Sequence, residues 1–343
     1  MRSKELVYWI EELDKKDNDL VGKKCANLGE LSRIGLRVPP GFTISVYAWN
    51  RFVDLTGMAE EMRGIFDHAR GELDLPVKGQ KVSQAVRDLI EAQEIPDEIA
   101  DPIRGCYARL CEKAGVSEVP VAVRSAGAIS MPGAMETYLN VTGEADVLKK
   151  ILRVWGSAYT YRAVIYRHNH NMSAQHASIG IAVLQLVDAK AAGVLMTANP
   201  TSGDTGEMVL ESNWGLGESV VSGVINPDRF NVGKKDLTIT GTINTKLKKI
   251  VPAGDGTEMI DVPIELQELP SLTDDEVRQL VRDGLRIEEH FGGPTDVEWA
   301  YSAGSPFPEN LYFLQARPMK PLPKYKDPIE KILDMMLGEL NSP

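Results

Sequence analysis

Residues 121–137 read Val121-Ala-Val-Arg-Ser-Ala-Gly-Ala-Ile-Ser-Met-Pro-Gly-Ala-Met-Glu-Thr137 and run from an apolar strand through small residues into a second strand. Arg124 stands at the end of the first strand, where its forked guanidinium suits phosphate. Gly127 and Gly133 let backbone N–H groups approach an anion closely. The segment predicts a phosphate-binding loop, although its residue types are equally compatible with an ordinary hairpin that carries a structural arginine.

A strand pair near residue 300 carries a second group of polar residues. Side chains alternate along a strand, so Asp296 and Glu298 share one face, and Gln315 and Arg317 share one face of the next strand. If the two faces coincide, Glu298 and Gln315 offer oxygen ligands to Mg²⁺, with Arg317 beside them for phosphate. The alternative is a solvated hairpin face. Core-like neighbours such as Trp299 disfavour it, because buried charges need partners.

Other motifs are less specific. Lys24 lies just after Val21-Gly22, at the start of a predicted helix. A lysine that follows a glycine turn is a common phosphate contact, although a solvated surface lysine is commoner still. Trp214-Gly-Leu-Gly-Glu218 is a glycine-rich turn that does not match the dinucleotide-binding Gly-x-Gly-x-x-Gly. The sequence contains no Gly-x-x-x-x-Gly-Lys-Ser/Thr, which excludes a P-loop protein. The spacing of His168, His170 and His176 suits no standard metal site.

Composition narrows the class of protein. The 343 residues predict about two domains. A hydrophobic content of 43% is typical of globular proteins, and the net charge of −11 disfavours binding to nucleic acid or anionic membranes. We expect no membrane span, no signal peptide and no disulfide framework from three cysteines, and therefore a cytoplasmic protein.

Periodicity predicts an α/β (α+β) chain of two lobes, with a change near residue 180. Helices are expected over 24–35, 45–52, 81–93, 97–114, 144–167 and 274–291. Strands are expected over 41–44, 119–125, 137–141, 179–187, 192–198, 207–212, 229–232, 237–243, 296–301 and 310–316. We place an N-terminal lobe at 1–180, a C-terminal lobe at 181–322 and a helical tail at 323–343.

Four blocks, taken in order, resemble the ATP-binding domain of the phosphoenolpyruvate synthase and pyruvate phosphate dikinase family, from about Leu20 to Pro318. They are Val21-Gly-Lys-Lys-Cys-Ala-Asn-Leu-Gly-Glu30, Val123 through Thr137, Trp214–Glu218 with Asn226-Pro-Asp228, and Asp296-Val-Glu-Trp-Ala300 with Gln315-Ala-Arg-Pro318. The resemblance implies an ATP-grasp-like fold that binds ATP and Mg²⁺ between two lobes.

The resemblance also implies roles for individual residues. Lys24, Arg124 and Arg317 would act on the ATP phosphates as catalytic residues, and Glu298 and Gln315 would hold Mg²⁺. Further nucleotide contacts are implied for Ser125, Gly127, Gly133, Thr137 and Asp296, and for the adenine-binding segment Gln185-Leu186-Val187. The family usually has Gly-Gly-Lys where this chain has Gly22-Lys23-Lys24, so Lys23 is a second candidate for the phosphate-binding lysine.

In this family ATP phosphorylates a histidine on a swivelling domain, whose Gly-x-Thr-Ser-His signature does not occur in these 343 residues. We therefore expect a larger partner subunit that bears the phosphohistidine, with ATP converted to AMP and phosphate. A chain of this kind resembles the small ATP-binding subunit of phenylphosphate synthase, which implies phenol as the acceptor. The alternatives are an acceptor such as pyruvate or the antibiotic rifampin, or a non-catalytic nucleotide sensor. The tail helix would pack on its own lobe or dock the partner.

Overall fold

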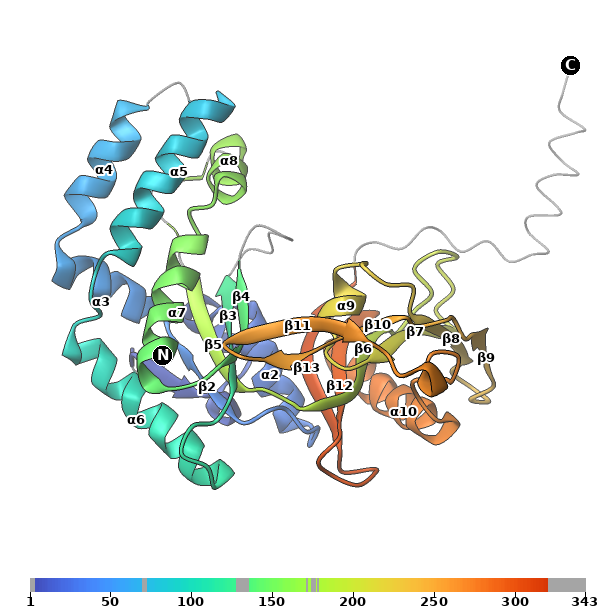
Figure 1. Ribbon diagram of the computed structural model, residues 1–343. Coiled ribbons are helices and arrows are strands. Elements are labelled where there is room, and N and C mark those ends of the chain that lie inside the picture. The colour runs from blue at the N-terminus through green and yellow to red at the C-terminus, as the bar shows by residue number, and fades with distance from the viewer. Residues whose placement is uncertain are drawn as a thin grey trace, which may run out of the picture.

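The computed structural model describes residues 4–69, 73–127, 136–170, 172–173, 177 and 179–319. Two lobes lie side by side, a largely helical one and one rich in strands (Figure 1). The expected two-lobed α/β fold is confirmed. Gly133, His176 and the tail 323–343 lie outside the described residues. No helix in the described part of the chain is both long and apolar enough to cross a bilayer.

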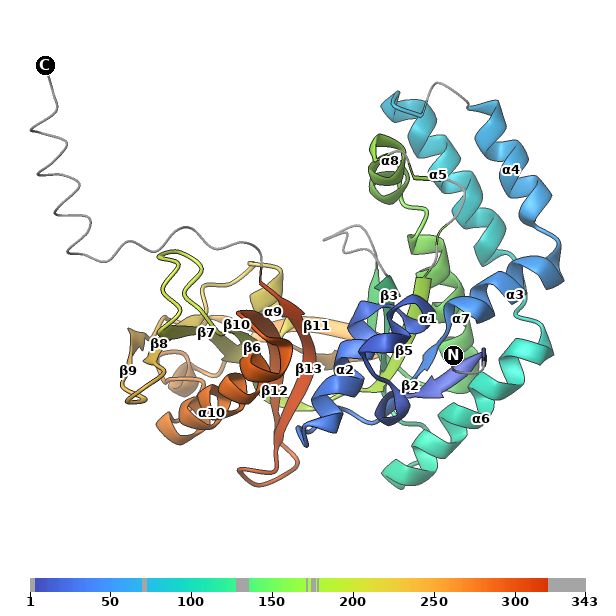
Figure 2. The same ribbon diagram turned by 180° about the vertical axis from the view of Figure 1, so that it is seen from behind.

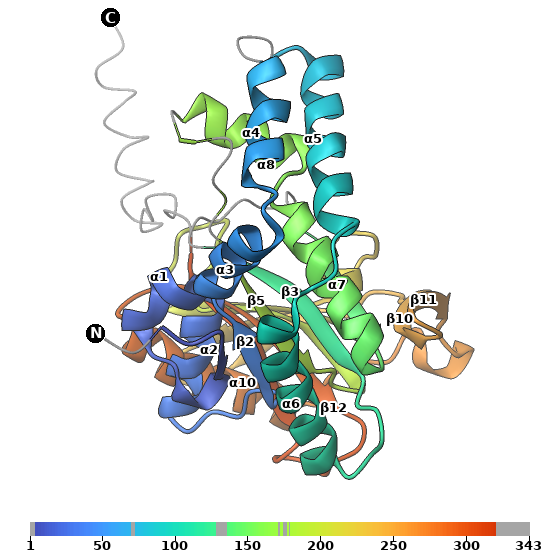
Figure 3. The ribbon, with the colours of Figure 1, turned by 90° about the vertical axis from the view of Figure 1, so that its left-hand side faces the viewer.

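Five antiparallel strands form the sheet of the first lobe, in the spatial order β1-β2-β5-β3-β4. Their bounds are β1 Val7–Trp9, β2 Gly41–Ile44, β5 Ile179–Gln185, β3 Val121–Gly127 and β4 Thr137–Val141. The helices of this lobe are α3 Val46–Thr56, α4 Ala59–His68, α5 Pro76–Glu91, α6 Asp97–Ala114, α7 Glu144–Ser157 and α8 Tyr161–Asn169. Helices α3, α6 and α7 lie across one face of the sheet, and α4, α5 and α8 extend beyond its end (Figure 3).

The second lobe is built on six antiparallel strands in the order β13-β12-β6-β7-β8-β9. Their bounds are β13 Leu311–Pro318, β12 Thr295–Ser302, β6 Ala189–Met196, β7 Glu207–Trp214, β8 Asp228–Gly233 and β9 Ile239–Thr242. Helix α10 (Asp274–Phe291) covers one face and buries Leu280 and Val281 in the same apolar core as Leu195 and Leu210. The short elements are η1 Ile10–Glu12, η2 Lys15–Asp17, α1 Asn18–Val21, α9 Glu218–Val221 and η3 Ile264–Leu266.

Helix α2 (Lys23–Arg33) joins the two lobes. It lies beside β13 (Figure 2), and its Leu28 shares an apolar core with Phe313 of the second lobe. The glycine that precedes the helix, Gly22, has φ +83°, and a Cβ there would meet the Ala126 carbonyl oxygen at 1.6 Å. Only glycine permits this approach, which sets the start of α2 against the end of β3.

A hairpin from the second lobe reaches the first. Strands β10 (Lys248–Ala253) and β11 (Gly256–Asp261) project across the molecule toward β4 (Figure 1). At its tip the Asn140 amide Nδ2 donates to the Gly254 carbonyl at 2.9 Å. The hairpin therefore spans the space between the lobes.

Three expectations require correction or extension. The helix expected over 144–167 is two helices, because Thr160 has extended backbone and its hydroxyl caps α8 by accepting from the Ala163 N–H. The lobe boundary expected after residue 180 falls inside β5, since that whole strand pairs with β2 and β3. Helix α4 and the β10–β11 hairpin were not predicted. By contrast, the helices predicted over 97–114 and 274–291 are confirmed, the latter with its Thr273 cap.

Candidate functional site

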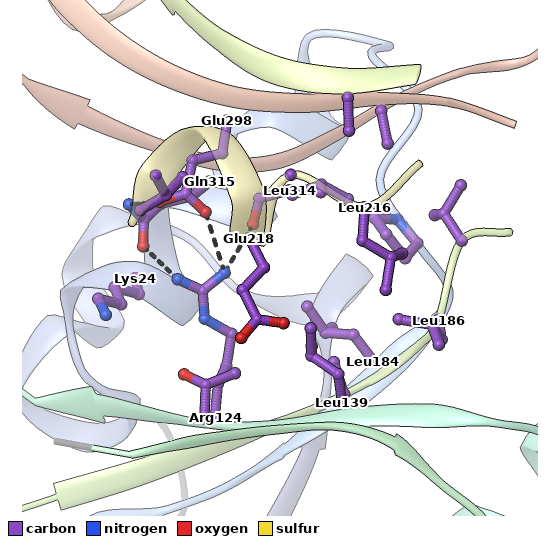
Figure 4. A pocket seen from close by; sticks show the side chains of 18 of the residues that line it. Lys24, Arg124, Leu139, Leu184, Leu186, Leu216, Glu218, Glu298, Leu314 and Gln315 are labelled. Atoms are coloured by element: carbon purple, nitrogen blue, oxygen red, sulfur yellow. Dashed lines mark hydrogen bonds and ion pairs between the residues drawn. The ribbon is translucent and has the colours of Figure 1, made fainter. Parts of the chain in front are cut away.

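A cavity of about 810 Å³ lies between the lobes. It is lined by β3, β4 and β5 of the first lobe, by α2, and by β6, β12, β13, α9 and the hairpin tip of the second. Charged and amide side chains gather at one end, and leucines gather at the other (Figure 4). The cavity therefore has a polar end and an apolar end.

Arg124 is the centre of the polar end and connects the lobes. From β3 it reaches the second lobe, where Nη2 donates to Gln315 Oε1 at 2.5 Å and Nη1 donates to the Leu314 carbonyl at 3.4 Å. Nη1 also lies 3.6 Å from Glu298 Oε2. Its Nε is buried and has no hydrogen-bond partner among the described residues. A largely buried guanidinium with a donor to spare is suited to an anionic ligand.

The faces of β12 and β13 coincide. Glu298 stands directly opposite Gln315 in the strand register, and Gln315 Nε2 donates to Glu298 Oε1 at 2.9 Å. Gln315 is 3% exposed, so its amide is held in place by Glu298 and Arg124. Sequence pattern had left open whether the two faces would meet, and the antiparallel register brings them together.

These residues fit a magnesium site of the kind that keeps most of its ligands as water and phosphate. No cluster of three or more His, Cys, Asp or Glu that could hold a metal occurs among the residues described. Mg²⁺ commonly takes only one or two protein carboxylates and fills its octahedron with water and substrate oxygens. The Glu298 carboxylate and the Gln315 amide are adjacent on neighbouring strands and would supply that minimal set, with the amide oxygen, which here accepts from Arg124, turned to the ion.

Arg317 and Asp296 form the next pair along the same two strands. Arg317 donates from Nε at 2.9 Å and from Nη2 at 2.7 Å to the same oxygen of Asp296. Arg317 lines the cavity and its side chain is 49% exposed, whereas Asp296 is not part of the lining. The structure therefore places Asp296 behind Arg317, where it orients the guanidinium.

Lys24 and Lys23 both line the cavity, but their surroundings differ. Lys23 is exposed, whereas Lys24 is half-buried at the polar end. The pKa of Lys24 is lowered to about 8, chiefly by burial and then by the nearby Arg124 guanidinium, against the opposing effect of Glu298. An ammonium that is destabilised in the free protein gains most from a bound anion, which favours Lys24 over Lys23 as the phosphate-binding lysine.

The apolar end is formed by Leu139, Leu184, Leu186 and Leu216 (Figure 4). The segment 185–187, expected to present backbone groups to a base, passes along this end. Two of its N–H groups are engaged, since Gln185 donates to the Pro40 carbonyl and Leu186 to the Pro120 carbonyl, each at 2.8 Å. Val187 remains as the candidate N–H donor of this segment.

Most of the other predicted residues also line the cavity. Ser125, Gly127 and Thr137 belong to its wall, at the two described ends of the small-residue loop. Gly133, inside that loop, lies outside the described residues. The structure thus brings together residues that are up to 293 positions apart in the sequence, from Lys24 to Arg317.

Sequence reasoning missed part of the lining. Asn27 on α2, Glu218 on α9 and residues 255–257 of the hairpin tip all face the cavity. The hairpin had a recognisable signal, because the two-residue loop Gly254-Asp255 separates two strands of mixed polarity. Glu218 ends a glycine-rich turn that belongs to one of the four blocks of the family resemblance, but no role was expected for it.

The comparisons with known proteins all point to the same family. Residues 18–335 match the family model described as the pyruvate phosphate dikinase AMP/ATP-binding domain. A probable phosphoenolpyruvate synthase of Methanocaldococcus jannaschii is 38% identical over 332 residues, which cover 94% of this chain and 27% of the relative. Phosphoenolpyruvate synthases of Aeropyrum pernix and Pyrococcus furiosus are 35% and 33% identical, with 91% and 92% of this chain and 42% and 44% of theirs covered. The chain spans less than half the length of these relatives.

Proposed function

The chain belongs to the pyruvate phosphate dikinase AMP/ATP-binding domain family, and on this premise we propose that its interlobe cavity binds ATP and delivers a phosphoryl group to a histidine. The observation that carries the proposal is the cluster of Arg124, Glu298 and Gln315, linked across the two lobes at the polar end of the cavity. The opposite, leucine-lined end suits a purine base.

Each residue of the polar end has a defined part in this proposal. Arg124 and Arg317 attract and bind the polyphosphate with their guanidinium groups, and Asp296, which accepts from Nε and Nη2 of Arg317, keeps that guanidinium oriented. Lys24 adds a positive charge that the bound phosphates stabilise. Glu298 and Gln315 hold Mg²⁺, which neutralises charge on the phosphoryl oxygens when bound.

The proposed reaction is of the dikinase type, as expected from the sequence. The β-phosphoryl group of ATP passes to a histidine nitrogen of a phosphohistidine-bearing partner, AMP leaves, and water releases the terminal phosphoryl group as phosphate. The Pα–O–Pβ and Pβ–O–Pγ bonds both break, and histidine and water each contribute one new bond to phosphorus. The histidine belongs to a partner subunit or to another domain of a longer chain.

The final acceptor is a separate question. The matched relatives are named phosphoenolpyruvate synthases, which favours pyruvate. Phenol, the acceptor of phenylphosphate synthase, and rifampin remain predictions that rest on the sequence resemblance alone. Incubating the phosphorylated partner with pyruvate, phenol and rifampin in turn would identify the acceptor by the product formed.

Position-specific labelling of ATP tests the transfer step. The protein is incubated with Mg²⁺, a phosphohistidine-carrier domain from a pyruvate phosphate dikinase family member, and ATP labelled at either the β or the γ phosphorus. We expect β-label on the carrier in an acid-labile, base-stable bond, γ-label in free phosphate, and AMP as the nucleotide product. Label transferred from the γ position with ADP as product would indicate an ordinary kinase and overturn the proposal. ATP binding without any AMP would instead favour the nucleotide sensor.

A further inference from the structure

The turn that ends β7 places an acidic side chain on the cavity wall. Gly215 has φ +74°, and a Cβ there would meet the Ile250 carbonyl oxygen at 2.3 Å. The next residue, Leu216, donates its N–H to that same oxygen at 2.8 Å. This hydrogen bond holds the turn against β10. Leu216 and Gly217 then lead directly to Glu218, the first residue of α9.

The hairpin also orients this acid. Thr257, on β11, donates from its hydroxyl to Glu218 Oε2 at 3.2 Å, and both residues line the cavity. The hairpin itself is held against the first lobe by the bond from Asn140 to Gly254. Glu218 is therefore fixed from two sides, by its own turn and by the hairpin tip.

Glu218 lies between the two ends of the cavity. In Figure 4 its carboxylate stands between Arg124 at the polar end and Leu184 and Leu216 at the apolar end. The sequence pattern alone assigns no role to Glu218. A carboxylate that faces a cavity in a polyanion-binding site repels phosphate, and because Glu218 is exposed there, a contact to the ligand's own hydrogen-bond donors can offset that repulsion.

A nucleotide supplies that contact. If the base occupies the leucine-lined end and the phosphates occupy the polar end, the sugar lies between them, beside Glu218. An ionised carboxylate accepts hydrogen bonds from two neighbouring hydroxyls without a donor of its own. We propose that Glu218, oriented by Thr257, accepts hydrogen bonds from the ribose 2′- and 3′-hydroxyls and makes the site selective for ribonucleotides.

The inference rests on the proposed function, because it needs ATP in this cavity. Asp255 is the competing acid, since it also lines the cavity from the hairpin tip. Glu218 is preferred because the hydrogen bond from Thr257 orients its carboxylate and because it lies between the two ends.

Calorimetric titration with ATP, 2′-deoxyATP and 3′-deoxyATP tests the proposal. The wild-type chain is compared with Glu218→Gln, Glu218→Ala, Thr257→Val and Asp255→Asn, with Glu258→Gln as a control on the same hairpin outside the cavity lining. The measured quantity is the ratio of dissociation constants for deoxy and ribo nucleotides. Loss of a negative charge strengthens the binding of all three polyphosphates alike, so it cancels in the ratio.

We expect wild type and the Glu258→Gln control to prefer ATP by at least about tenfold, as a hydrogen bond to a charged group predicts. Glu218→Ala should bring the ratio close to one, and Thr257→Val should reduce it partially. An unchanged ratio in Glu218→Ala, or a loss of selectivity in Asp255→Asn alone, overturns the assignment while leaving ATP binding intact. Failure of wild type to bind any of the three nucleotides would overturn the proposed function as well.

Discussion

Arg124 and Gln315 lie 191 positions apart in the sequence, on opposite lobes, and are joined by a 2.5 Å hydrogen bond from the guanidinium Nη2 to the amide Oε1. The same guanidinium reaches the Leu314 carbonyl and lies beside Glu298. The amide in turn donates to Glu298. Each lobe therefore contributes part of one polar cluster, and neither lobe forms the site alone.

The first prediction follows from that geometry. Arg124→Lys keeps the charge but replaces the fork that reaches Gln315, Leu314 and Glu298 by a single ammonium. We expect ATP-dependent AMP formation to fall by at least about tenfold, or ~1.4 kcal/mol of transition-state stabilisation. Arg109→Lys is a control with the same chemistry, because Arg109 stacks on Trp9 away from the cavity. Wild-type turnover in Arg124→Lys would make this arginine purely structural.

The second prediction concerns the metal. Glu298→Gln preserves the shape and the neighbours of the side chain but removes its charge, so the fold should be retained. We expect Mg²⁺-dependent phosphoryl transfer to fall by several kcal/mol of transition-state stabilisation, because a charged metal ligand is lost. Binding of Mn²⁺ to the ATP complex, followed by electron paramagnetic resonance, reports on the metal directly. Unchanged Mn²⁺ affinity would exclude Glu298 as a ligand. Glu211→Gln is the matched control, since Glu211 lies on the same sheet but outside the cavity lining.

Strand periodicity predicted which polar residues share a face, and the register of β12 and β13 places Glu298 opposite Gln315 as that reasoning required. Alternation holds over Asp296–Glu298 and Gln315–Arg317, whereas the register shifts between Glu298 and Trp299, so the strand period fixes the shared face only up to that irregularity. Helix ends were predictable where capping residues mark them, as at Thr273. The break after Ser157 was not, because an apolar stripe continues through Ala158 and Tyr159, which are buried without being helical.

Contacts between distant segments were not predictable. Nothing in the local pattern indicates that the tip at Gly254 meets Asn140, or that Glu218 meets Thr257. Such contacts depend on how the lobes and the hairpin are arranged in space, and local propensity carries no information on that. The pattern also could not separate Lys23 from Lys24, since the difference between them is one of burial.

The third prediction concerns pH. The pKa of Lys24 is lowered to about 8, chiefly by burial and then by Arg124, so the neutral amine is favoured in the free protein above that pH. Bound polyphosphate stabilises the ammonium and raises this pKa toward its ordinary value. The complex then holds more protons than the free protein above pH 8, and affinity for ATP must fall as pH rises.

Titration calorimetry at pH 9 in buffers of different ionisation enthalpy measures this proton uptake. With the pKa restored in the complex, we expect uptake of about 0.9 proton per ATP. Lys24→Met should abolish the uptake, and the neighbouring Lys23→Met should retain it. Proton uptake lost in Lys23→Met instead would transfer the phosphate-binding role to Lys23.

The fourth prediction concerns the hairpin contact. Asn140 has φ +57°, a conformation that glycine adopts without strain and alanine does not. Asn140→Gly removes the amide that donates to Gly254 while keeping the backbone, whereas Asn140→Ala adds backbone strain. We expect faster amide hydrogen exchange in β10 and β11 in both variants, with a larger loss of global stability in Asn140→Ala. Unchanged exchange in Asn140→Gly would show that the hairpin is held in place without this bond.

The last prediction concerns the buried charges at the base of the hairpin. Lys246 Nζ lies 2.7 Å from Asp228 Oδ1, and both side chains are completely buried. Asp228 also accepts hydrogen bonds from the Ser271 N–H and hydroxyl and from the Asn244 N–H. These three donors remain if the ammonium is removed, but the carboxylate then carries an uncompensated buried charge.

Lys246→Met should therefore lower the free energy of unfolding by about 3–5 kcal/mol, the usual cost of breaking a buried pair from one side. Lys248→Met is the matched control, because Lys248 lies at the same 2.7 Å from Asp261 with both side chains largely exposed. An exposed pair contributes only about 0–1 kcal/mol. Because the two ion pairs have the same N–O distance, the difference in unfolding free energy between the two variants, measured with urea, reports the effect of burial alone. Equal losses in both would mean that burial adds nothing to the pair that joins β8 to the base of the hairpin.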